Sequence, residues 1–246
     1  MADGDKQILE EFDSESGGGK LGRHIFHDPQ NRAFPARGIL FAEAAPIVPR
    51  VWWVRHLFDQ GDTSRCTVET AAGMVFSSPN RLELDRANLE RYDEEDERQE
   101  LYLVSQRDHD PWPGGEPDYL GTSSDAPAKE LRARGHIREW RWCFGLDDVL
   151  RTLSVHGPVG IGTYWFEGMD EPIGDAAVLE LMGQARGGHE TLLYAVKPDD
   201  DYDGGGYVDG VNSWGPWGPR RGRFRLSWRT LEDLLEQDGD AWTIVL

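Results

Sequence analysis

The sequence predicts an α+β protein of two lobes, because its front half is patterned for helices and its back half for strands. Between residues 63 and 154, several segments carry apolar residues at helical spacing. Beyond residue 157 the chain changes to short β-rich segments separated by turns, among them GPVGIGTYW, ETLLYAV, YVDGVNSW and RFRLSW. A block of helices followed by a block of strands is typical of an α+β fold. We therefore expect a helical lobe over residues 51–143, a β-rich lobe over residues 144–246, and a cleft between them.

Residues 1–50 are expected to form a tail and an extended arm in front of the lobes. The first twenty residues are acidic and end in GGGK, which is typical of a mobile tail. A phosphate-binding loop is the alternative for this glycine run, but Leu21 follows the lysine where Ser or Thr is needed, and no hydrophobic strand precedes it. From Arg23 to Pro49 the chain has several prolines and no clear period, so we expect it to lie extended over the body.

The strongest predicted helix begins around Cys66. Thr63 and Ser64 are its candidate N-caps. This start places Cys66 in the first helical turn, where backbone N–H groups and the helix dipole favour a thiolate over a thiol. The apolar residues that follow recur at i, i+3, i+4, i+7 and i+8, which is one face of a helix: Val68, Ala71, Ala72, Val75 and Phe76.

Further helical segments are expected in the front half and at the start of the back half. The charged run over residues 80–100 is most simply the solvated face of a helix. A loop rich in proline and glycine follows it. Residues 124–135 then read as a helix that ends at a glycine, and residues 146–154 as another short helix.

Composition and charge limit the classes of function. The chain has 246 residues, 38% of them hydrophobic and 11% aromatic, which is enough for a substantial core. It has no apolar run long enough to span a membrane and no apolar stretch of signal-peptide type at its start, so we expect a cytoplasmic protein. Its formal net charge of −19 argues against nucleic acid or anionic membrane as a partner, and favours solubility and cationic substrates.

Four residues spread along the chain carry the chemistry of a thiol hydrolase: Gln60 in DQGDTSRC, Cys66 in the same segment, His189 in GGHETLLYAV and Asn212 in NSWGPWG. A thiolate attacks a carbonyl, an imidazole transfers the proton, and an amide orients the imidazole. A glutamine side chain and the cysteine N–H stabilise the oxyanion. A lone cysteine is more often a buried core residue, and a lone histidine is equally uninformative. The order and local contexts of the four together carry the prediction.

These motifs resemble the papain-like cysteine peptidases of the C1 family, and are closest in character to bacterial and phage-type members. The resemblance runs from about Asp59 to Val245 and covers DQGDTSRCTVETAAG, GTSSDAPAKELRARGHIREWRW, GPVGIGTYWFEGM, GGHETLLYAV and VNSWGPWGPRRGRFRLSW. It implies one catalytic domain over residues 51–246 with the active site in the cleft. The helical lobe would carry the cysteine and glutamine, and a β-barrel-like lobe the histidine and asparagine. It implies no cofactor.

The resemblance also implies positions that bind substrate. Gly121 and Thr122 stand where the family has paired glycines that hydrogen-bond the substrate backbone. Gly188 precedes the histidine, where a glycine allows close approach of backbone or substrate. Trp214 would shield the bond between Asn212 and His189 from water.

The sequence departs from the family pattern at the nucleophile. The family signature Cys-Gly-Ser-Cys-Trp reads here as Thr63-Ser64-Arg65-Cys66-Thr67. The missing disulfide partner suits a reducing compartment, and Arg65 could either help to hold a thiolate or obstruct a substrate. The N-terminal fifty residues are too short for the family's usual inhibitory propeptide, so activity must be controlled otherwise or not at all. Cys143 is expected to be a free, mostly buried thiol.

Two segments resemble metal-binding motifs, but each is better explained without a metal. Residues 199–204, DDDYDG, match the start of a calcium loop, but Gly210 stands where the loop needs Glu and the flanks read as strands, so an acidic turn is expected. His24, His27 and Asp28 are an incomplete ligand set without a distant partner cluster, so a surface histidine pair is expected.

The expected function is that of a thiol endopeptidase acting on peptide or protein substrates, in the cytoplasm or in a virion. The Cys66 sulfur should lie within about 4 Å of one His189 nitrogen, with the other facing Asn212. The same residues could instead hydrolyse an amide of a peptidoglycan stem or transfer an acyl group. A third alternative is a silent structural or binding component of a phage particle or other protein assembly. Intact Gln, Cys, His and Asn favour an enzyme.

Overall fold

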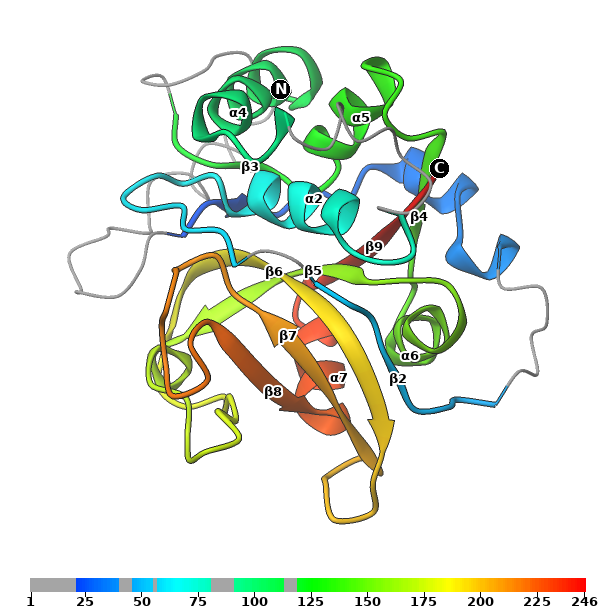
Figure 1. Ribbon diagram of the computed structural model, residues 1–246, viewed down its shortest axis with the longest axis vertical. Coiled ribbons are helices and arrows are strands. Elements are labelled where there is room, and N and C mark those ends of the chain that lie inside the picture. The colour runs from blue at the N-terminus through cyan, green and yellow to red at the C-terminus, as the bar shows by residue number, and fades with distance from the viewer. Residues whose placement is uncertain (1–20, 40–45, 55–56, 81–90, 113–118) are drawn as a thin grey trace.

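The computed structural model describes residues 21–39, 46–54, 57–80, 91–112 and 119–246 of the chain (Figure 1). The predicted mobile tail lies outside the described residues. So do the first part of the charged run, over residues 81–90, and the loop over residues 113–118.

The α-helices of the described residues form two groups on opposite sides of a sheet (Figure 1). The group nearer the N-terminus is α2 (Cys66–Phe76), α4 (Glu95–His109) and α5 (Ala126–Ala133). The second group is α6 (Leu146–Val155) and α7 (Trp228–Glu236). The predicted helices at Cys66, 124–135 and 146–154 are thereby confirmed. None of the described helices is both long and apolar enough to cross a membrane.

The main sheet is antiparallel, with the strand order β4-β9-β5-β6-β7-β8, and β2 pairs with β6 beside this path. Its strands are β2 (Arg50–Val51), β4 (Glu139–Trp142), β5 (Val159–Phe166), β6 (Ala185–Pro198), β7 (Gly206–Val211), β8 (Arg223–Ser227) and β9 (Asp240–Val245). A second, parallel pair joins β1 (Arg23–His24) to β3 (Thr122–Ser123). Short 3-10 turns complete the fold: η1 (Pro29–Ala33), η2 (Ala36–Gly38) and η4 (Glu167–Asp170).

The sheet separates two hydrophobic cores, because alternate residues of a strand point to opposite faces. On β9, Trp242 and Ile244 join the core that contains α2, α4 and α5, whereas Ala241 joins the core that contains α6 and α7. On β6, Leu192 and Leu193 divide in the same way. The strands of the back half therefore hold both groups of helices in place.

Two expectations for local structure need correction, and a third is confirmed. The α2 helix has Arg65 as its N-cap, without a side-chain capping bond, so the predicted caps Thr63 and Ser64 are wrong. The stretch from Arg23 to Pro49 is not uniformly extended, since it contains β1, η1 and η2. The acidic segment after β6 is a turn into β7, as expected, with a 3.0 Å bond from the Asp199 N–H to the Gly205 carbonyl.

Candidate active site

Cys66 is the first residue of α2 and is fully buried. Burial raises the pKa of its thiol to about 12, and the nearby Glu190 carboxyl adds to the shift. The Glu190 and Thr67 backbone N–H groups lie at the sulfur and act in the opposite direction. The helix start thus supplies the N–H donors that favour a thiolate, but burial of the sulfur outweighs them. In this closed state, burial therefore favours the thiol over the expected thiolate.

His189 lies on β6 and Asn212 directly follows β7, the neighbouring strand. The Nε2 atom of His189 is 2.8 Å from Oδ1 of Asn212, and the same Oδ1 accepts the Ser213 N–H at 2.7 Å. Because Oδ1 is an acceptor, Nε2 must carry the proton. The other ring nitrogen, Nδ1, is then a free acceptor, and it has no hydrogen-bond partner among the described residues. An imidazole held in this tautomer can receive a proton at Nδ1.

Tryptophan side chains enclose the histidine. The His189 ring lies 4.8 Å from Trp214 and 4.9 Å from Trp165 between ring centroids, and Trp217 stacks edge-on against Trp214. Asp170 accepts a bond from Trp165 Nε1 on its carboxylate and one from Trp217 Nε1 on its carbonyl. Trp214 therefore lies against His189, where it was expected to shield the bond to Asn212 from water. Trp165 is a second aromatic contact of His189, which the sequence did not predict.

Burial disfavours the charged form of the histidine, as it does that of the cysteine. It lowers the pKa of His189 to about 4, against the hydrogen bond of Asn212, which raises it. With a thiol pKa of about 12, both groups are neutral at pH 7. This state is an imidazole and a thiol and not an ion pair.

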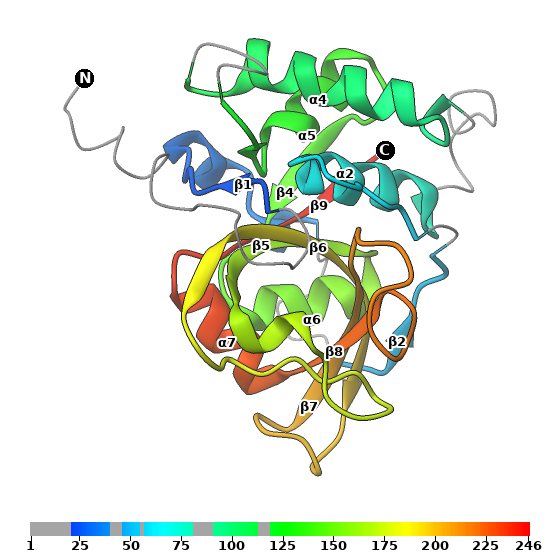
Figure 2. The same ribbon diagram turned by 90° about the vertical axis from the view of Figure 1, so that its left-hand side faces the viewer.

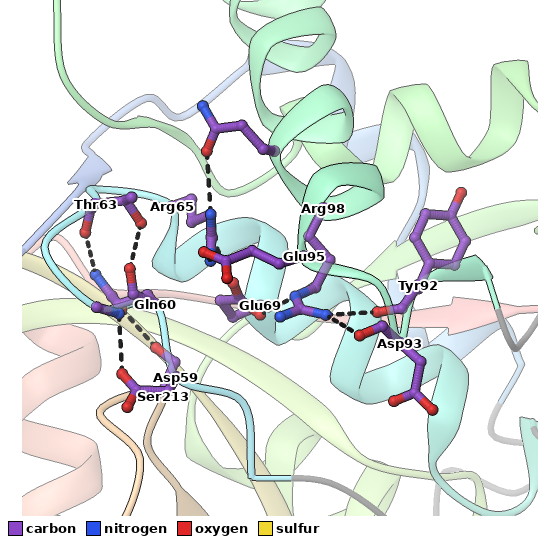
Figure 3. Close-up of polar contacts among 12 residues, drawn as sticks. Asp59, Gln60, Thr63, Arg65, Glu69, Tyr92, Asp93, Glu95, Arg98 and Ser213 are labelled. Carbon is purple, nitrogen blue, oxygen red and sulfur yellow. Dashed lines mark hydrogen bonds and ion pairs between the residues drawn. The ribbon is translucent and has the colours of Figure 1, made fainter.

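Gln60 is fully buried, and its carboxamide is fixed at both ends (Figure 3). Its Nε2 donates to the Thr63 carbonyl at 2.7 Å, and its Oε1 accepts the Ser213 hydroxyl at 2.6 Å. Ser213 also donates its N–H to Asn212, so one residue orients both predicted amides. Gln60 and Asn212 are brought together by this link although they lie far apart in the sequence.

Arg65 does not face the nucleophile. Figure 3 shows its guanidinium directed to Glu69 and Glu95, with N–O distances of 2.6 and 2.8 Å. Arg98 of α4 reaches the other oxygen of Glu69 at 2.8 Å. The open question of this arginine is thus resolved: it neither holds a thiolate nor obstructs a substrate, and it joins α2 to α4.

The backbone positions expected to bind substrate are already in contact with the chain's own arm. The Gly22 N–H donates to the Gly188 carbonyl at 3.1 Å, and the Thr122 N–H donates to the Gly22 carbonyl at 2.9 Å. Gly121 lies against the same Gly22 carbonyl, closely enough that a side chain would collide with it. The arm therefore crosses between the two lobes at the residue before His189, where Figure 2 shows β1 between the helices and β6.

The metal alternatives find no support in the described part of the chain. No group of three or more His, Cys, Asp or Glu side chains there could hold a metal ion. The ring of His24 is not simply at the surface, since its Nε2 lies 2.6 Å from the Leu120 carbonyl, whereas His27 is exposed. Cys143 is a free, buried thiol 3.4 Å from the Thr152 hydroxyl, as expected.

Comparison with solved structures identifies the architecture. Digestive procathepsin L 3 of Tenebrio molitor superposes with a TM-score of 0.63 and 15% identity, over 92% of this chain and 76% of that one. Xylellain, a cysteine protease from Xylella fastidiosa, gives a TM-score of 0.55 and 15% identity over 94% and 98%. The proform of Amb a 11, a cysteine protease of ragweed pollen, gives 0.55 and 14% over 87% and 70%.

Comparison of the sequence alone gives no counterpart: neither protein-family models nor curated proteins match the chain. At about 15% identity the structural likeness shows the fold, which is the two-lobed α+β fold of papain-like cysteine proteases. The expected fold class is thereby confirmed.

Proposed function

We propose that the chain is a papain-like thiol endopeptidase, with Cys66 as nucleophile, His189 as base, Asn212 as the residue that orients the base and Gln60 in the oxyanion site. The observation that carries the proposal is the state of His189. Its Nε2 is held by Asn212 at 2.8 Å, while its Nδ1 is buried without a partner among the described residues. A buried nitrogen without a partner is costly unless it has a task.

The proposed reaction follows from these roles. The Cys66 thiol transfers its proton to His189 Nδ1 while the sulfur bonds to the peptide carbonyl carbon. The resulting oxyanion is stabilised by N–H donors of Gln60 and of the Cys66 backbone. His189 then gives its proton to the leaving amine as the C–N bond breaks. Water attacks the thioester, loses a proton to His189, and releases the acid and the free thiol.

Asn212 serves this cycle by holding Nε2–H in the neutral and in the charged form of the imidazole. The bond strengthens when the ring becomes cationic, since hydrogen bonds to charged groups are about twice as strong as neutral ones. Trp214 and Trp165 exclude water from this bond. The same Cys-His-Asn site could also act on a non-peptide amide or transfer an acyl group, because the substrate is chosen by the cleft.

One observation favours the silent alternative. Cys66 and His189 are 0% and 1% exposed, so a substrate carbonyl does not reach the sulfur in this state. A papain-like structural or binding component would keep such a closed site. The enzyme requires that the arm over Gly188 leaves the cleft.

Labelling and cleavage together test the proposal. An active-site-directed epoxide should add one mass increment on Cys66, and a casein or peptide-library digest should show cleavage. Cys66→Ala and His189→Ala should each abolish cleavage, since the two residues act as one unit. Cys143→Ala and His27→Ala are matched controls and should leave it intact. Cleavage that survives Cys66→Ala would exclude the mechanism.

We further propose a bacterial or phage-type member that acts in the cytoplasm or in a virion. Two free thiols support the proposed location, because they suit a reducing compartment. Peptide or protein substrates are the proposed partners. Detection of the chain by mass spectrometry in fractionated cells or purified particles would test the location.

A further inference from the structure

Arg23 of the arm is a buried arginine whose charge acts on the thiol of the proposed nucleophile. The residue is 3% exposed, although arginine is rarely buried without a specific partner. Its neighbour Gly22 is bonded to Gly188 and Thr122, so the side chain of Arg23 enters the protein from the place where a substrate backbone is expected. Its backbone carbonyl lies against Gly188, where a Cβ would collide with it.

The guanidinium of Arg23 ends in an acidic pocket. Its Nη2 lies 2.6 Å from Asp240 Oδ2 and 2.8 Å from the Asp238 carbonyl. Ser124 donates its hydroxyl to the second oxygen of Asp240 at 2.8 Å. Glu190, the residue after the proposed base, accepts a hydrogen bond from Trp242 Nε1 at 3.0 Å, and its carboxyl is close enough for the charge of Arg23 to lower its pKa.

The pocket contains two carboxyl groups and one cationic side chain. Glu190 and Asp240 are the buried carboxyls, and the charge of Arg23 acts on both of them. Burial, and secondly the charge of Asp240, raise the pKa of Glu190, whereas Arg23 lowers it. Without a guanidinium the two carboxyls would oppose each other in a medium of low dielectric constant. The pocket therefore favours a cationic side chain over a neutral one.

Arg23 occupies the pocket but leaves several of the buried hydrogen-bonding groups there without a partner. Its Nε and Nη1 atoms and the Oε2 atom of Glu190 are buried without hydrogen-bond partners among the described residues. A guanidinium selected solely for a structural role would normally have these donors paired. Space for the group depends on Gly162, where a Cβ would meet the Asp240 carboxylate, Arg23 Nε at 2.6 Å and the Ser124 hydroxyl at 2.7 Å.

We propose that the pocket of Glu190, Asp240, Ser124 and Gly162 is the substrate subsite for an arginine side chain, and that Arg23 occupies it as a ligand supplied by the chain itself. The substrates are then peptides that carry arginine one subsite away from the backbone contacts of Gly188 and Thr122. This inference rests on the proposed function for the meaning of substrate. The cation-binding pocket itself does not depend on catalysis.

Binding to a full-length chain with Cys66→Ala isolates the pocket from the chemistry. The probe is a fluorescein-labelled hexapeptide that copies residues 21–26, Leu-Gly-Arg-His-Ile-Phe, and its analogue with Gln in place of Arg. The chains compared are Cys66→Ala alone and with Arg23→Ala, which empties the pocket. Arg138→Ala is the matched control, since that arginine is largely exposed.

The expected result is an order of affinities. Arg23→Ala should bind the arginine peptide about tenfold or more tighter than the parent, and the glutamine peptide about tenfold or more weaker than the arginine peptide. Adding Asp240→Asn should remove this preference, whereas Asp209→Asn, at the paired carboxylate of Arg225, should not. Equal binding of the two peptides, or a preference that survives Asp240→Asn, would overturn the proposal.

A second variant should empty the pocket without changing any of the residues that line it or Arg23 itself. Gly22→Val should expel the arm, because a side chain there collides with the Ser64 carbonyl. It should then bind the arginine peptide as Arg23→Ala does. If both variants lose their native near-ultraviolet circular dichroism, Arg23 is a structural ion-pair residue and the proposal is wrong.

The two proposals fail separately. If the chain binds arginine peptides selectively through Asp240 but never cleaves a peptide, the arginine subsite is supported and the peptidase function is excluded. If the chain with Cys66 intact cleaves peptides without preferring arginine at any position, the arginine subsite is excluded and the peptidase function is supported.

Discussion

His189 shows how one residue is fitted for two protonation states. Its resting state is neutral, because Trp165, Trp214 and the surrounding chain exclude water. Its catalytic state would be cationic, and the bond from Nε2 to Asn212 is suited to hold it. The neutral form is favoured while the arm covers the site. Entry of water or of a polar substrate would move the pKa of the ring back toward its ordinary value.

The buried neutral state of His189 predicts a pH dependence of stability. Its folded pKa is about 4, below its ordinary value of 6.5. Between pH 6.5 and 4 the unfolded chain binds a proton that the folded chain does not. The contribution of this residue is therefore complete above pH 6.5 and is lost as the pH falls toward 4, with a slope of up to about 1.4 kcal/mol per pH unit.

Urea unfolding at several pH values from 7.5 to 4.5 measures this slope, and His189→Gln is the comparison. The difference in slope between the two chains isolates this histidine from His24 and His136, whose pKa values burial also lowers. Identical slopes in both chains would show that the imidazole is not buried in solution.

Gln60 predicts a loss of rate without a loss of fold. Gln60→Ala should lower kcat by about 10²–10³, the usual cost of one oxyanion donor. Its carboxamide also orients Ser213 and through it Asn212, so part of the loss should appear as a poorly held base. Asn212→Ala should weaken catalysis less than His189→Ala, because the amide transfers no proton. Initial rates on one peptide substrate give all three values, and a Gln60→Ala enzyme of unchanged kcat would exclude the oxyanion role.

At the scale of elements, the position of Cys66 depends on a buried charge network between α2 and α4. Glu69 of α2 receives Arg65 from its own helix at 2.6 Å and Arg98 from α4 at 2.8 Å (Figure 3). Arg98 also donates to the Tyr92 and Asp93 carbonyls and lies over the Phe58 ring at 4.5 Å. The start of α2 is held by these contacts and not by a side-chain cap.

Removing the central carboxylate should therefore destabilise the helical lobe. Glu69→Gln leaves the buried guanidinium of Arg98 without its carboxylate partner and leaves Arg65 with the exposed Glu95 as its remaining one, which is expected to cost about 3–5 kcal/mol in free energy of unfolding. Glu97→Gln, at a more exposed ion pair with Arg91, is the matched control and should cost at most about 1 kcal/mol. Chemical denaturation of both variants decides. Equal losses in free energy of unfolding would mean that the buried network stabilises the lobe no more than an exposed ion pair does.

The elements that the sequence predicted share strong local signals, and the missed ones do not. The segment after Cys66 has an apolar face of helical period, and the glycine-bounded strands around His189 stand out from their flanks. By contrast, β4 has four residues and pairs with β9 about a hundred positions later. Such a pairing is set by the two cores on either side of it. The helix α7 is the exception among the elements that were not predicted, because Ser227 accepts the Thr230 N–H as its N-cap and is a start signal in the sequence.

At the scale of the molecule, the arm links the two lobes across the site. Gly22 forms hydrogen bonds with Gly188 of the sheet and with Thr122 beside the helices, and Arg23 reaches Asp240 at the start of β9. The four catalytic candidates were predictable because each has a local context. Arg23 was not, since its burial arises from carboxyls 167 and 217 positions away that no local pattern connects. The one general signal was the acidic net charge of −19, which favoured cationic substrates.

The covering of the site by the arm gives a prediction for the reactivity of the whole chain. Cys66 and Cys143 are both buried, each with a pKa raised to about 12 by burial. Gly22→Val should displace the arm and accelerate alkylation of Cys66 by iodoacetamide about tenfold or more, as expected when local opening becomes easier by about 1.4 kcal/mol. Cys143, near Thr152 in the other core, should keep its rate.

Peptide mapping by mass spectrometry reads both cysteines in one sample, so Cys143 is an internal control for global unfolding. Gly38→Val is the matched variant: it changes the same arm, but a Cβ there meets nothing nearer than Arg141 Nη1 at 3.6 Å. It should leave both rates unchanged. If both cysteines accelerate in Gly22→Val, the variant has loosened the whole fold. If neither does, the arm does not control access to Cys66, because a displaced arm must admit the reagent to the start of α2.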